Sequence, residues 1–209
     1  MNHSRFVNKA LLAMLATAAI SAHAGPISGV IVSTSFPLSE TNSLIGNITD
    51  GSGLSFYTTS ATHATSTANN AFLQFGPSIG TITFDLGTVT GINGMAVWNW
   101  NGNGTSVYGI QALTIEQSLN GTSFTPIAGA PTSFAEGSNG GTELAQLFSF
   151  AATTRFVRFD VTSSFYRDGA GLDEVMFTTP DSRVPEPGMG ALAALGVAAM
   201  VLSRRVRRS

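Results

Sequence analysis

The first candidates for chemistry in this chain are carboxylates, and their spacing decides what they could do. A glycosidase needs two carboxyl groups about 5 to 9 Å apart, on either side of the scissile bond. Asp173 and Glu174 are neighbours in a predicted strand, so their side chains point to opposite faces and cannot form that pair. Asp160 and Asp168 remain as the alternative pair of a glycan-active enzyme, with no motif around them.

Nucleophiles and soft metal ligands are scarce. Cysteine is absent, and His63 is the single histidine after residue 24, which excludes zinc sites built from thiolates or from several histidines. A Ser-His-Asp triad would have to use His63, and no Gly-x-Ser-x-Gly motif occurs. His63 lies in a Ser/Thr-rich stretch, so we predict it to be a surface-loop residue. Gly102-Asn103-Gly104 lacks the third glycine and the helix of a phosphate-binding loop.

Aromatic residues near turns are the candidates for stacking on a sugar ring. Trp98 belongs to an apolar strand and is predicted to lie in the core. Trp100 follows it beside an Asn-Gly-rich turn, where its ring would reach the rim of the domain. Tyr166 and Arg167 precede Gly169 in a predicted loop, and loops on a rigid scaffold commonly carry binding residues. We therefore take Trp100, Tyr166 and Arg167 as candidate ligand-binding residues, with a solvated loop as the alternative for the last two.

The elements that position these residues are short strands. Between residues 29 and 177 no segment sustains the period of a helix. Thr81 to Leu86 alternates between apolar and polar residues, and Asn120-Gly121 between two strand-like runs predicts an antiparallel hairpin. The predicted strands are 81–86, 91–100, 113–118, 124–127, 147–150, 155–161 and 172–177. Strands of this length separated by turns predict an all-β fold, a single antiparallel sandwich.

Charge is distributed unevenly along the 209 residues. Six of the ten Lys and Arg lie near the two ends, which leaves four against all twelve Asp and Glu between residues 25 and 187, a net charge of about −8. Nucleic acid is excluded as a partner, because no basic stripe exists to neutralise phosphates. Cations and neutral sugars remain compatible with this charge. The roughly 160 residues suit one domain, which must be stabilised by its core, or by a bound metal, since disulfides are unavailable.

The first 24 residues have the pattern of a secretory signal peptide. Arg5 and Lys9 form a positive region, an apolar run follows, and Ala22-His23-Ala24 is a small-x-small cleavage site. We predict cleavage between Ala24 and Gly25, which makes the protein an exported one. The alternative, an uncleaved transmembrane helix, would need a longer apolar stretch.

The C-terminal residues have three parts in a fixed order. Val184, Pro185, Glu186 and Pro187 lie within a linker at 181–187. The two prolines have no backbone N–H to donate and keep this tetrapeptide extended. An apolar run at 188–203 follows as a short transmembrane anchor, and an arginine-rich tail at 204–209 should stay in the cytoplasm. The alternative is an ordinary single-helix tail anchor.

This tail resembles the PEP-CTERM sorting signal of Gram-negative bacteria. The resemblance implies processing at Val184, Pro185, Glu186 and Pro187 by an exosortase-type membrane transpeptidase. It also implies anchoring in the inner membrane before processing, and transfer to the cell surface or extracellular matrix afterwards.

Five short motifs occur in a recognisable order through residues 28–178. They are Asn47-Ile48-Thr49-Asp50-Gly51, Ile82 to Gly87, Leu113 to Gly121, Arg155 to Phe159, and Gly171 to Val175. Together they resemble the discoidin domain, also called the coagulation-factor type C domain. The resemblance implies an eight-stranded jelly-roll sandwich of the galactose-binding-like superfamily over residues 25–180. It also implies non-catalytic binding of glycans, lipid head groups or proteins.

The same resemblance implies a structural calcium site between the early Asp-Gly turn and the late strand. The matching residues are Asp50, Ser55 and Glu174, with Tyr57 where the family usually has tryptophan. Two carboxylates and a hydroxyl would need only turn carbonyls and water to complete six to eight oxygens around Ca²⁺. Without a metal, Asp50 would form an Asx turn and Glu174 would be a surface carboxylate.

These observations favour an exported surface or matrix protein whose sandwich binds a carbohydrate, for instance an exopolysaccharide, without catalysis. A structural matrix component without a specific ligand is the first alternative, and a glycan-active enzyme is the second. An exposed aromatic among polar loop residues would favour carbohydrate binding, whereas two facing carboxylates in a cleft would favour the enzyme.

Overall fold

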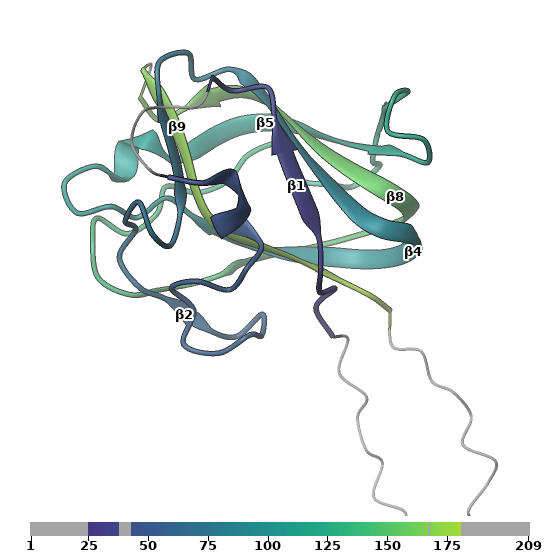
Figure 1. Cartoon of the computed structure of the whole chain (residues 1–209), viewed down its shortest axis with the longest axis horizontal. Coiled ribbons are helices and arrows are strands. Elements are labelled where there is room, and N and C mark those ends of the chain that lie inside the picture. Colours follow the sequence, from purple (N-terminus) through teal and green to yellow (C-terminus); the bar gives the residue numbers. More distant parts are fainter. Residues whose placement is uncertain (1–24, 38–42, 167, 181–209) are drawn as a thin grey trace, which may run out of the picture.

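The computed structural model describes residues 25–37, 43–166 and 168–180, and nearly all of its regular structure is β (Figure 1). Its elements are β1 (Ile31–Thr34), the 3-10 helix η1 (Ile45–Ile48), β2 (Thr62–His63), β3 (Phe72–Phe75), β4 (Gly80–Asn99), the 3-10 helix η2 (Ser106–Tyr108), β5 (Ile110–Ser118), β6 (Thr125–Pro126), β7 (Glu143–Leu144), β8 (Gln146–Ser164) and β9 (Gly169–Thr178). No helix within these ranges has the length and apolar character to cross a bilayer. The signal peptide and the C-terminal sorting signal lie outside the described residues.

Two long strands hold the fold together. β4 and β8 pair antiparallel along most of their length, and the register shifts between Asp85 and Thr90 and again between Ile92 and Gly94. Such bulges bend a strand and increase its twist. One half of the pair is flanked by β1 and by β5 and β6, and the other half by β9 and β3. The bend therefore makes β4 and β8 members of both layers of an antiparallel sandwich (Figure 1).

The core lies between the two layers and is rich in phenylalanine. Phe84 of β4, Phe159 of β8 and Phe177 of β9 are fully buried, with the Phe84 ring centroid 4.9 Å from that of Phe159 and 5.2 Å from that of Phe177. Edge-to-face aromatic pairs add about 0.5–1.5 kcal/mol to the gain from area burial. These contacts join β4 and β8 of one layer to β9 of the other.

Most of the strand predictions are confirmed. Ile82, Phe84 and Leu86 are all buried on one face of β4, and β5 and β6 form the predicted hairpin around Gly121, whose φ is +74°. The predicted strands 81–86 and 91–100 are one continuous strand, because the bulges bend it without ending it. The predicted strands 147–150 and 155–161 likewise belong to β8. Trp98 lies in the core, as expected.

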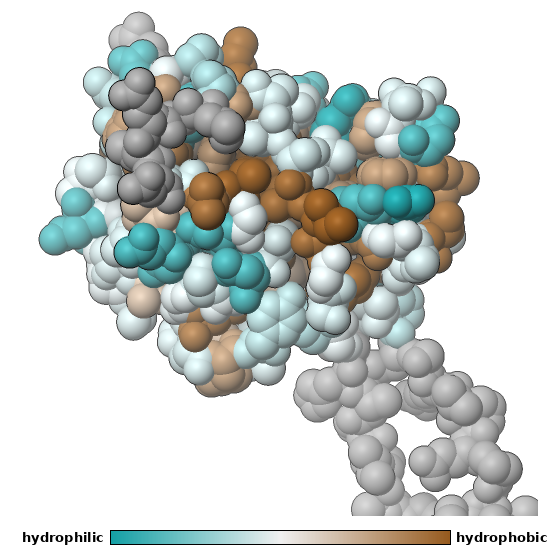
Figure 2. Space-filling model, in the orientation of Figure 1, coloured by the Kyte–Doolittle hydropathy of each residue, from teal (hydrophilic) through white to brown (hydrophobic). Residues whose placement is uncertain are grey.

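β1, β2, β3 and β7 were not predicted as strands. β1 pairs with β4 along one edge, and the side chain of Ile31 is 71% exposed. Figure 2 shows apolar surface across the middle of the face on which β1 lies in Figure 1. The four residues of β1, Ile31 to Thr34, do not alternate between apolar and polar types, so the sequence pattern on which the other strands were predicted is absent.

The N-terminal and C-terminal ends of the domain's chain lie side by side. Pro26 forms a bridge with Thr178, and the Thr179 amide donates to the Gly25 carbonyl over 3.4 Å. Every strand and the whole buried core of the described chain lie between these ends. A fragment of residues 25–180 therefore contains the complete sandwich.

Candidate functional site

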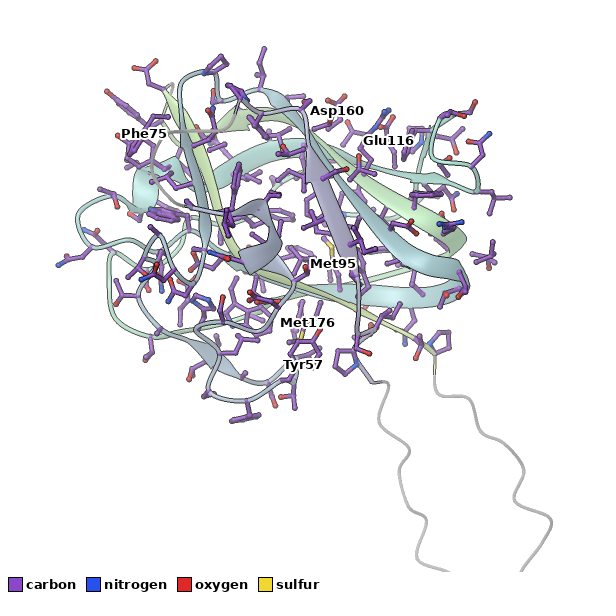
Figure 3. All side chains as sticks on the ribbon, in the orientation of Figure 1. Tyr57, Phe75, Met95, Glu116, Asp160 and Met176 are labelled. Atoms are coloured by element: carbon purple, nitrogen blue, oxygen red, sulfur yellow. The ribbon has the colours of Figure 1, made fainter. Side chains whose placement is uncertain are left out.

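Three aromatic side chains gather at one end of the sandwich, and we call Phe75, Tyr108 and Tyr166 the aromatic cluster. The Tyr108 ring centroid lies 5.3 Å from that of Phe75 and 5.6 Å from that of Tyr166, both pairs being edge-to-face. Phe75 is 48% exposed and Tyr166 is 47% exposed. Figure 3 places Phe75 at the corner of the molecule remote from the point where the chain ends leave it.

Each ring of the cluster is positioned by a different element. Phe75 ends β3, Tyr108 ends η2, and Tyr166 follows β8. Gly169 brings these elements together, because a Cβ at this position would lie 2.6 Å from Tyr108 Cδ1 and 2.8 Å from the Gln74 carbonyl oxygen. The Ser164 hydroxyl donates to the Tyr166 carbonyl. The cluster is thus held by backbone contacts as well as by ring packing.

Trp100 supports the cluster from beneath. It is only 5% exposed, and Tyr108 packs against the group formed by Trp100, Ala71 and Leu73. The Trp100 Nε1–H donates to the Thr105 hydroxyl over 3.2 Å, and the ring lies against Gly171, where a Cβ would come within 2.9 Å. The expected rim exposure of Trp100 is therefore wrong, since the absent side chain of Gly171 lets the ring sink into the fold.

The other two predicted ligand-binding residues differ in outcome. Tyr166 is exposed as expected, whereas Arg167 lies outside the described residues. Sequence reasoning missed Phe75 and Tyr108. A signal for Phe75 existed in its position directly before Gly76-Pro77, where an aromatic residue precedes a turn.

The structure brings together part of the predicted calcium site of Asp50, Ser55 and Glu174. The Gly51 amide donates to Glu174 Oε2 over 3.0 Å, so the early turn and β9 are in direct contact. Glu174 is fully buried, which corrects the surface alternative, and its Oε1 has no hydrogen-bond partner within the described chain. The pKa of Glu174 is raised to about 9, mainly by burial; the Gly51 hydrogen bond opposes this rise and the Asp50 charge adds to it.

Asp50 lies beside the Glu174 carboxylate, and Ser55 follows in the same loop. Asp50 Oδ1 accepts from the Ser52 amide over 2.8 Å, which is the Asx turn expected of an aspartate without metal. The Ser55 hydroxyl accepts from the Thr62 amide over 3.1 Å and is exposed. The charges of Glu174 and Asp50 also raise the pKa of Tyr57, after the larger effect of burial, which places that phenol beside both carboxylates.

His63 is buried, so the prediction of a surface-loop histidine is wrong. Its Nδ1 lies 2.7 Å from the Ala64 carbonyl and its Nε2 lies 2.9 Å from the Ser52 carbonyl. Asp173 Oδ2 is 3.4 Å from Nδ1, and Asp173 Oδ1 accepts from the Ser66 hydroxyl. Burial lowers the pKa of His63, although its hydrogen bonds to backbone carbonyls oppose this shift. Burial also raises the pKa of Asp173 well above its usual range. The buried contact between His63 and Asp173 therefore connects β2 to β9.

A family model of the F5/8 type C domain matches residues 32–174. The chain belongs to the F5/8 type C domain family. This assignment confirms the discoidin-like resemblance of the sequence. No curated protein sequence matches the chain.

Several solved structures share the fold of this F5/8 type C domain. A carbohydrate-binding module from Clostridium perfringens, in complex with GalNAc-β-1,3-galactose, has 15% identity and a TM-score of 0.53, covering 74% of this chain and 99% of its own. The lectin domain of lectinolysin, in complex with Lewis B antigen, has 14% identity and a TM-score of 0.53, covering 74% and 95%. A pectin-binding module has 14% identity and a TM-score of 0.52, covering 77% and 95%.

The F5/8 type C domain has the donors for a hard cation at the Gly51–Glu174 contact. A buried carboxylate oxygen without a partner is costly unless a proton or a cation compensates it. Asp50 has a second carboxylate beside this one, and Ser55 has a hydroxyl in the same loop that would have to turn toward an ion. Oxygen ligands of this kind suit calcium. Within the described residues no three Asp, Glu, His or Cys side chains lie close enough together to hold a metal ion, so carbonyls and water would have to complete the shell. The residues present therefore fit calcium and do not fit zinc.

Two hollows within the described part of the chain contain no pair of carboxylates. A hollow of about 380 Å³ beside the β5–β6 hairpin has no acidic lining residue, and one of about 550 Å³ beside β1 has Asp50 alone. Asp160 is half-buried on β8 and Asp168 is exposed before β9. Neither side chain lines either of these two hollows.

Proposed function

We propose that this F5/8 type C domain binds a carbohydrate through the aromatic cluster, without catalysing a reaction on it. The observation that carries the proposal is the half exposure of Phe75 and Tyr166 in a preformed group of rings. Exposed apolar groups gathered in one place mark binding surfaces. A pyranose presents an apolar C–H face to such rings and hydroxyls to the polar groups around them.

Three further observations support this proposal. The cluster lies where β3, η2 and β8 end, at one end of a rigid sandwich, and binding residues are commonly found at such positions. The domain is acidic between its ends, which disfavours anionic partners such as nucleic acid. Structures of the same fold include modules described with bound GalNAc-β-1,3-galactose and Lewis B antigen, which makes a glycan the first ligand class to test.

We infer a structural role for calcium beside this function. Asp50, Ser55 and Glu174 would hold the ion, and its charge would compensate the buried Glu174 carboxylate. The ion would fasten the loop that begins at Gly51 onto β9, which also contains Gly171 beneath Trp100. Calcium would then act on stability, at a distance from the sugar-binding rings.

The setting proposed for the domain is the cell surface or the extracellular matrix of a Gram-negative bacterium. Export would depend on cleavage between Ala24 and Gly25, and release from the inner membrane on exosortase processing at Val184, Pro185, Glu186 and Pro187. Gly25 and Thr179 lie side by side at the end remote from Phe75 (Figures 1 and 3). A chain anchored by its C terminus would therefore present the aromatic cluster outward, where an exopolysaccharide is the natural partner.

A glycan array tests the proposal with the fragment of residues 25–180. We expect binding to a limited set of glycans, and loss of that binding in Phe75→Ala. Phe56→Ala is the matched control, because Phe56 is a similarly exposed phenylalanine outside the cluster. A wild-type fragment that binds no glycan would favour a structural matrix component, and turnover of a glycan would favour an enzyme.

A further inference from the structure

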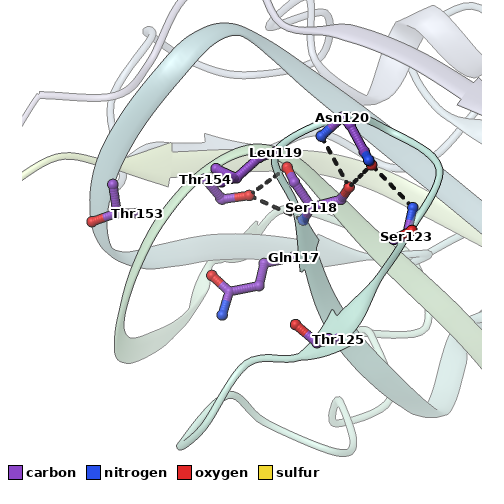
Figure 4. Close-up of a pocket in the computed structure, with 8 residues that line it drawn as sticks. All are labelled: Gln117, Ser118, Leu119, Asn120, Ser123, Thr125, Thr153 and Thr154. Carbon is purple, nitrogen blue, oxygen red and sulfur yellow. Dashed lines mark hydrogen bonds between the residues drawn. The ribbon is translucent and has the colours of Figure 1, made fainter.

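A polar groove lies beside the tip of the β5–β6 hairpin (Figure 4). It encloses about 380 Å³ between the hairpin and the part of β8 that contains Thr153 and Thr154. This volume lies within the range of small-molecule sites. Figure 3 shows Glu116, on the same hairpin, far across the molecule from Phe75, so the groove is separate from the aromatic cluster.

The floor of the groove is fixed by buried hydrogen bonds. The Thr154 hydroxyl accepts from the Ser118 amide over 3.1 Å and lies 2.9 Å from the Ser118 carbonyl, to which it donates. The Ser118 hydroxyl accepts from the Gly121 amide over 3.0 Å and bonds to Asn120 Oδ1. Gly121 packs on the Phe156 ring, which a Cβ would approach to 3.2 Å. The shape of the groove therefore exists before any ligand binds.

The rim of the groove, in contrast, has polar side chains without hydrogen-bond partners in the described part of the protein. The side-chain amide of Gln117 and the hydroxyls of Ser123, Thr125 and Thr153 make no hydrogen bond within the part of the chain that the structure describes. Figure 4 shows Gln117 between Thr153 and Thr125 at the opening of the groove. A preformed floor with an uncommitted polar rim is an arrangement that a hydrogen-bonding ligand can complete at low entropic cost.

The groove has no charged lining residue, which narrows the class of ligand. The nearest cations on β8 are already paired, Arg155 with Asp85 over 2.8 Å and Arg158 with Glu116 over 2.6 Å. An anionic ligand would therefore meet no free positive charge. Leu119, which is 64% exposed, adds one apolar side chain to the rim. Hydroxyls and amides around a neutral hollow with one apolar edge suit a neutral sugar.

We propose that this groove is a second carbohydrate site, which takes one neutral sugar residue and does not depend on the aromatic cluster. Two separated sites on one domain would let the protein join two polysaccharide chains, or two segments of one chain. Linked sites also raise the overall affinity when both can be engaged together.

Nuclear magnetic resonance titration of the ¹⁵N-labelled fragment 25–180 tests the groove. The probes are the methyl glycosides of galactose, glucose, mannose and N-acetylglucosamine at millimolar concentrations. At least one of them should shift the amide signals of residues 117–125 and 153–154 in a saturable way. The double substitution Thr125→Val and Thr153→Val removes two rim hydroxyls while preserving shape, and should weaken this binding about tenfold.

Thr162→Val is the matched control, since Thr162 is an exposed threonine of the same strand β8 outside the groove. It should leave the titration unchanged. Phe75→Ala should also leave it unchanged, which separates the groove from the aromatic cluster whether or not that cluster binds. The proposal is overturned if none of the four glycosides shifts the groove signals, or if the double variant binds as well as the wild type.

Discussion

The backbone amide of Gly51 donates to the carboxylate of Glu174 over 3.0 Å, although 123 positions separate the two residues in sequence. This contact fastens the early Asp-Gly turn to the last strand of the sandwich. It leaves Glu174 Oε1 buried without a partner in the described chain and sets Asp50 beside the same carboxylate. A calcium ion between Asp50 and Glu174 would give Glu174 Oε1 a partner and would offset the repulsion between the two carboxylates. The first two predictions follow from this.

Calcium should stabilise the wild-type fragment. A ligand that binds only the folded state adds about 2.7 kcal/mol at a hundredfold excess over its dissociation constant. Thermal melts should therefore shift upward with Ca²⁺ and return with EDTA. Glu174→Gln keeps the shape of the side chain and the Gly51 contact but removes the charge, so it should abolish the calcium-dependent shift. A wild-type melt that is unaffected by calcium and EDTA would leave Asp50 with its Asx turn alone.

Stability in EDTA should depend on pH through Glu174. Its pKa rises from the ordinary 4.5 to about 9 in the folded state, so between these values Glu174 holds a proton in the folded chain that it has lost in the unfolded chain. Stability is then fully present below pH 4.5 and decreases as the pH rises towards 9, by up to about 1.4 kcal/mol per unit. Denaturant melts across this window should show a steeper decline for the wild type than for Glu174→Gln. Equal slopes would contradict the burial of an uncompensated carboxyl.

Gly169→Ala should damage the aromatic cluster. The new Cβ would lie 2.6 Å from Tyr108 Cδ1 and 2.8 Å from the Gln74 carbonyl, so ring and backbone must both move. We expect a loss of stability of about 1–3 kcal/mol, as for other overpacked positions, and weaker glycan binding. Gly129→Ala serves as a comparison, because that glycine has open space but a φ of +77° and reports backbone strain alone. Unchanged stability in Gly169→Ala would show that Tyr108 is not held as described.

Processing should remove both predicted targeting segments. Intact mass spectrometry of the protein from cells with the matching transpeptidase should show a chain that begins at Gly25 and lacks the four terminal arginines. Glu186→Ala should block the C-terminal step without changing the melting temperature, because position 186 lies beyond the last strand of the sandwich. Recovery of only full-length C termini would contradict the sorting signal, and retention of residues 1–24 would indicate an uncleaved anchor.

The sequence predicted the fold where the physical signal is local. Ile82, Phe84 and Leu86 alternate with polar residues, and Asn120-Gly121 supplies the turn of a hairpin, so both features could be read without a structure. The family resemblance predicted that the early Asp-Gly turn meets the strand of Glu174, which no local pattern could show for residues so far apart, but the hydrogen bond from Gly51 itself was not predicted.

The misjudged residues share one physical cause. His63 lies in a polar stretch and Trp100 lies beside a polar turn, yet both are buried, because their environment is made by segments distant in sequence. Trp100 is accommodated by Gly171, and His63 by Ser52 and Asp173. Phe75 and Tyr108 were missed for the same reason, since only the folded chain brings them to Tyr166.

The central claim, that the aromatic cluster binds a sugar, is tested most directly by titration calorimetry with the strongest glycan from the array. We compare the wild-type fragment with Phe75→Ala, Tyr166→Ala, Tyr166→Phe and the control Phe56→Ala. Each alanine substitution in the cluster should weaken binding by about tenfold or more, equivalent to about 1.4 kcal/mol, whereas Tyr166→Phe, which retains the ring, and Phe56→Ala should bind nearly as the wild type does. Wild-type affinity in both Phe75→Ala and Tyr166→Ala would contradict the claim.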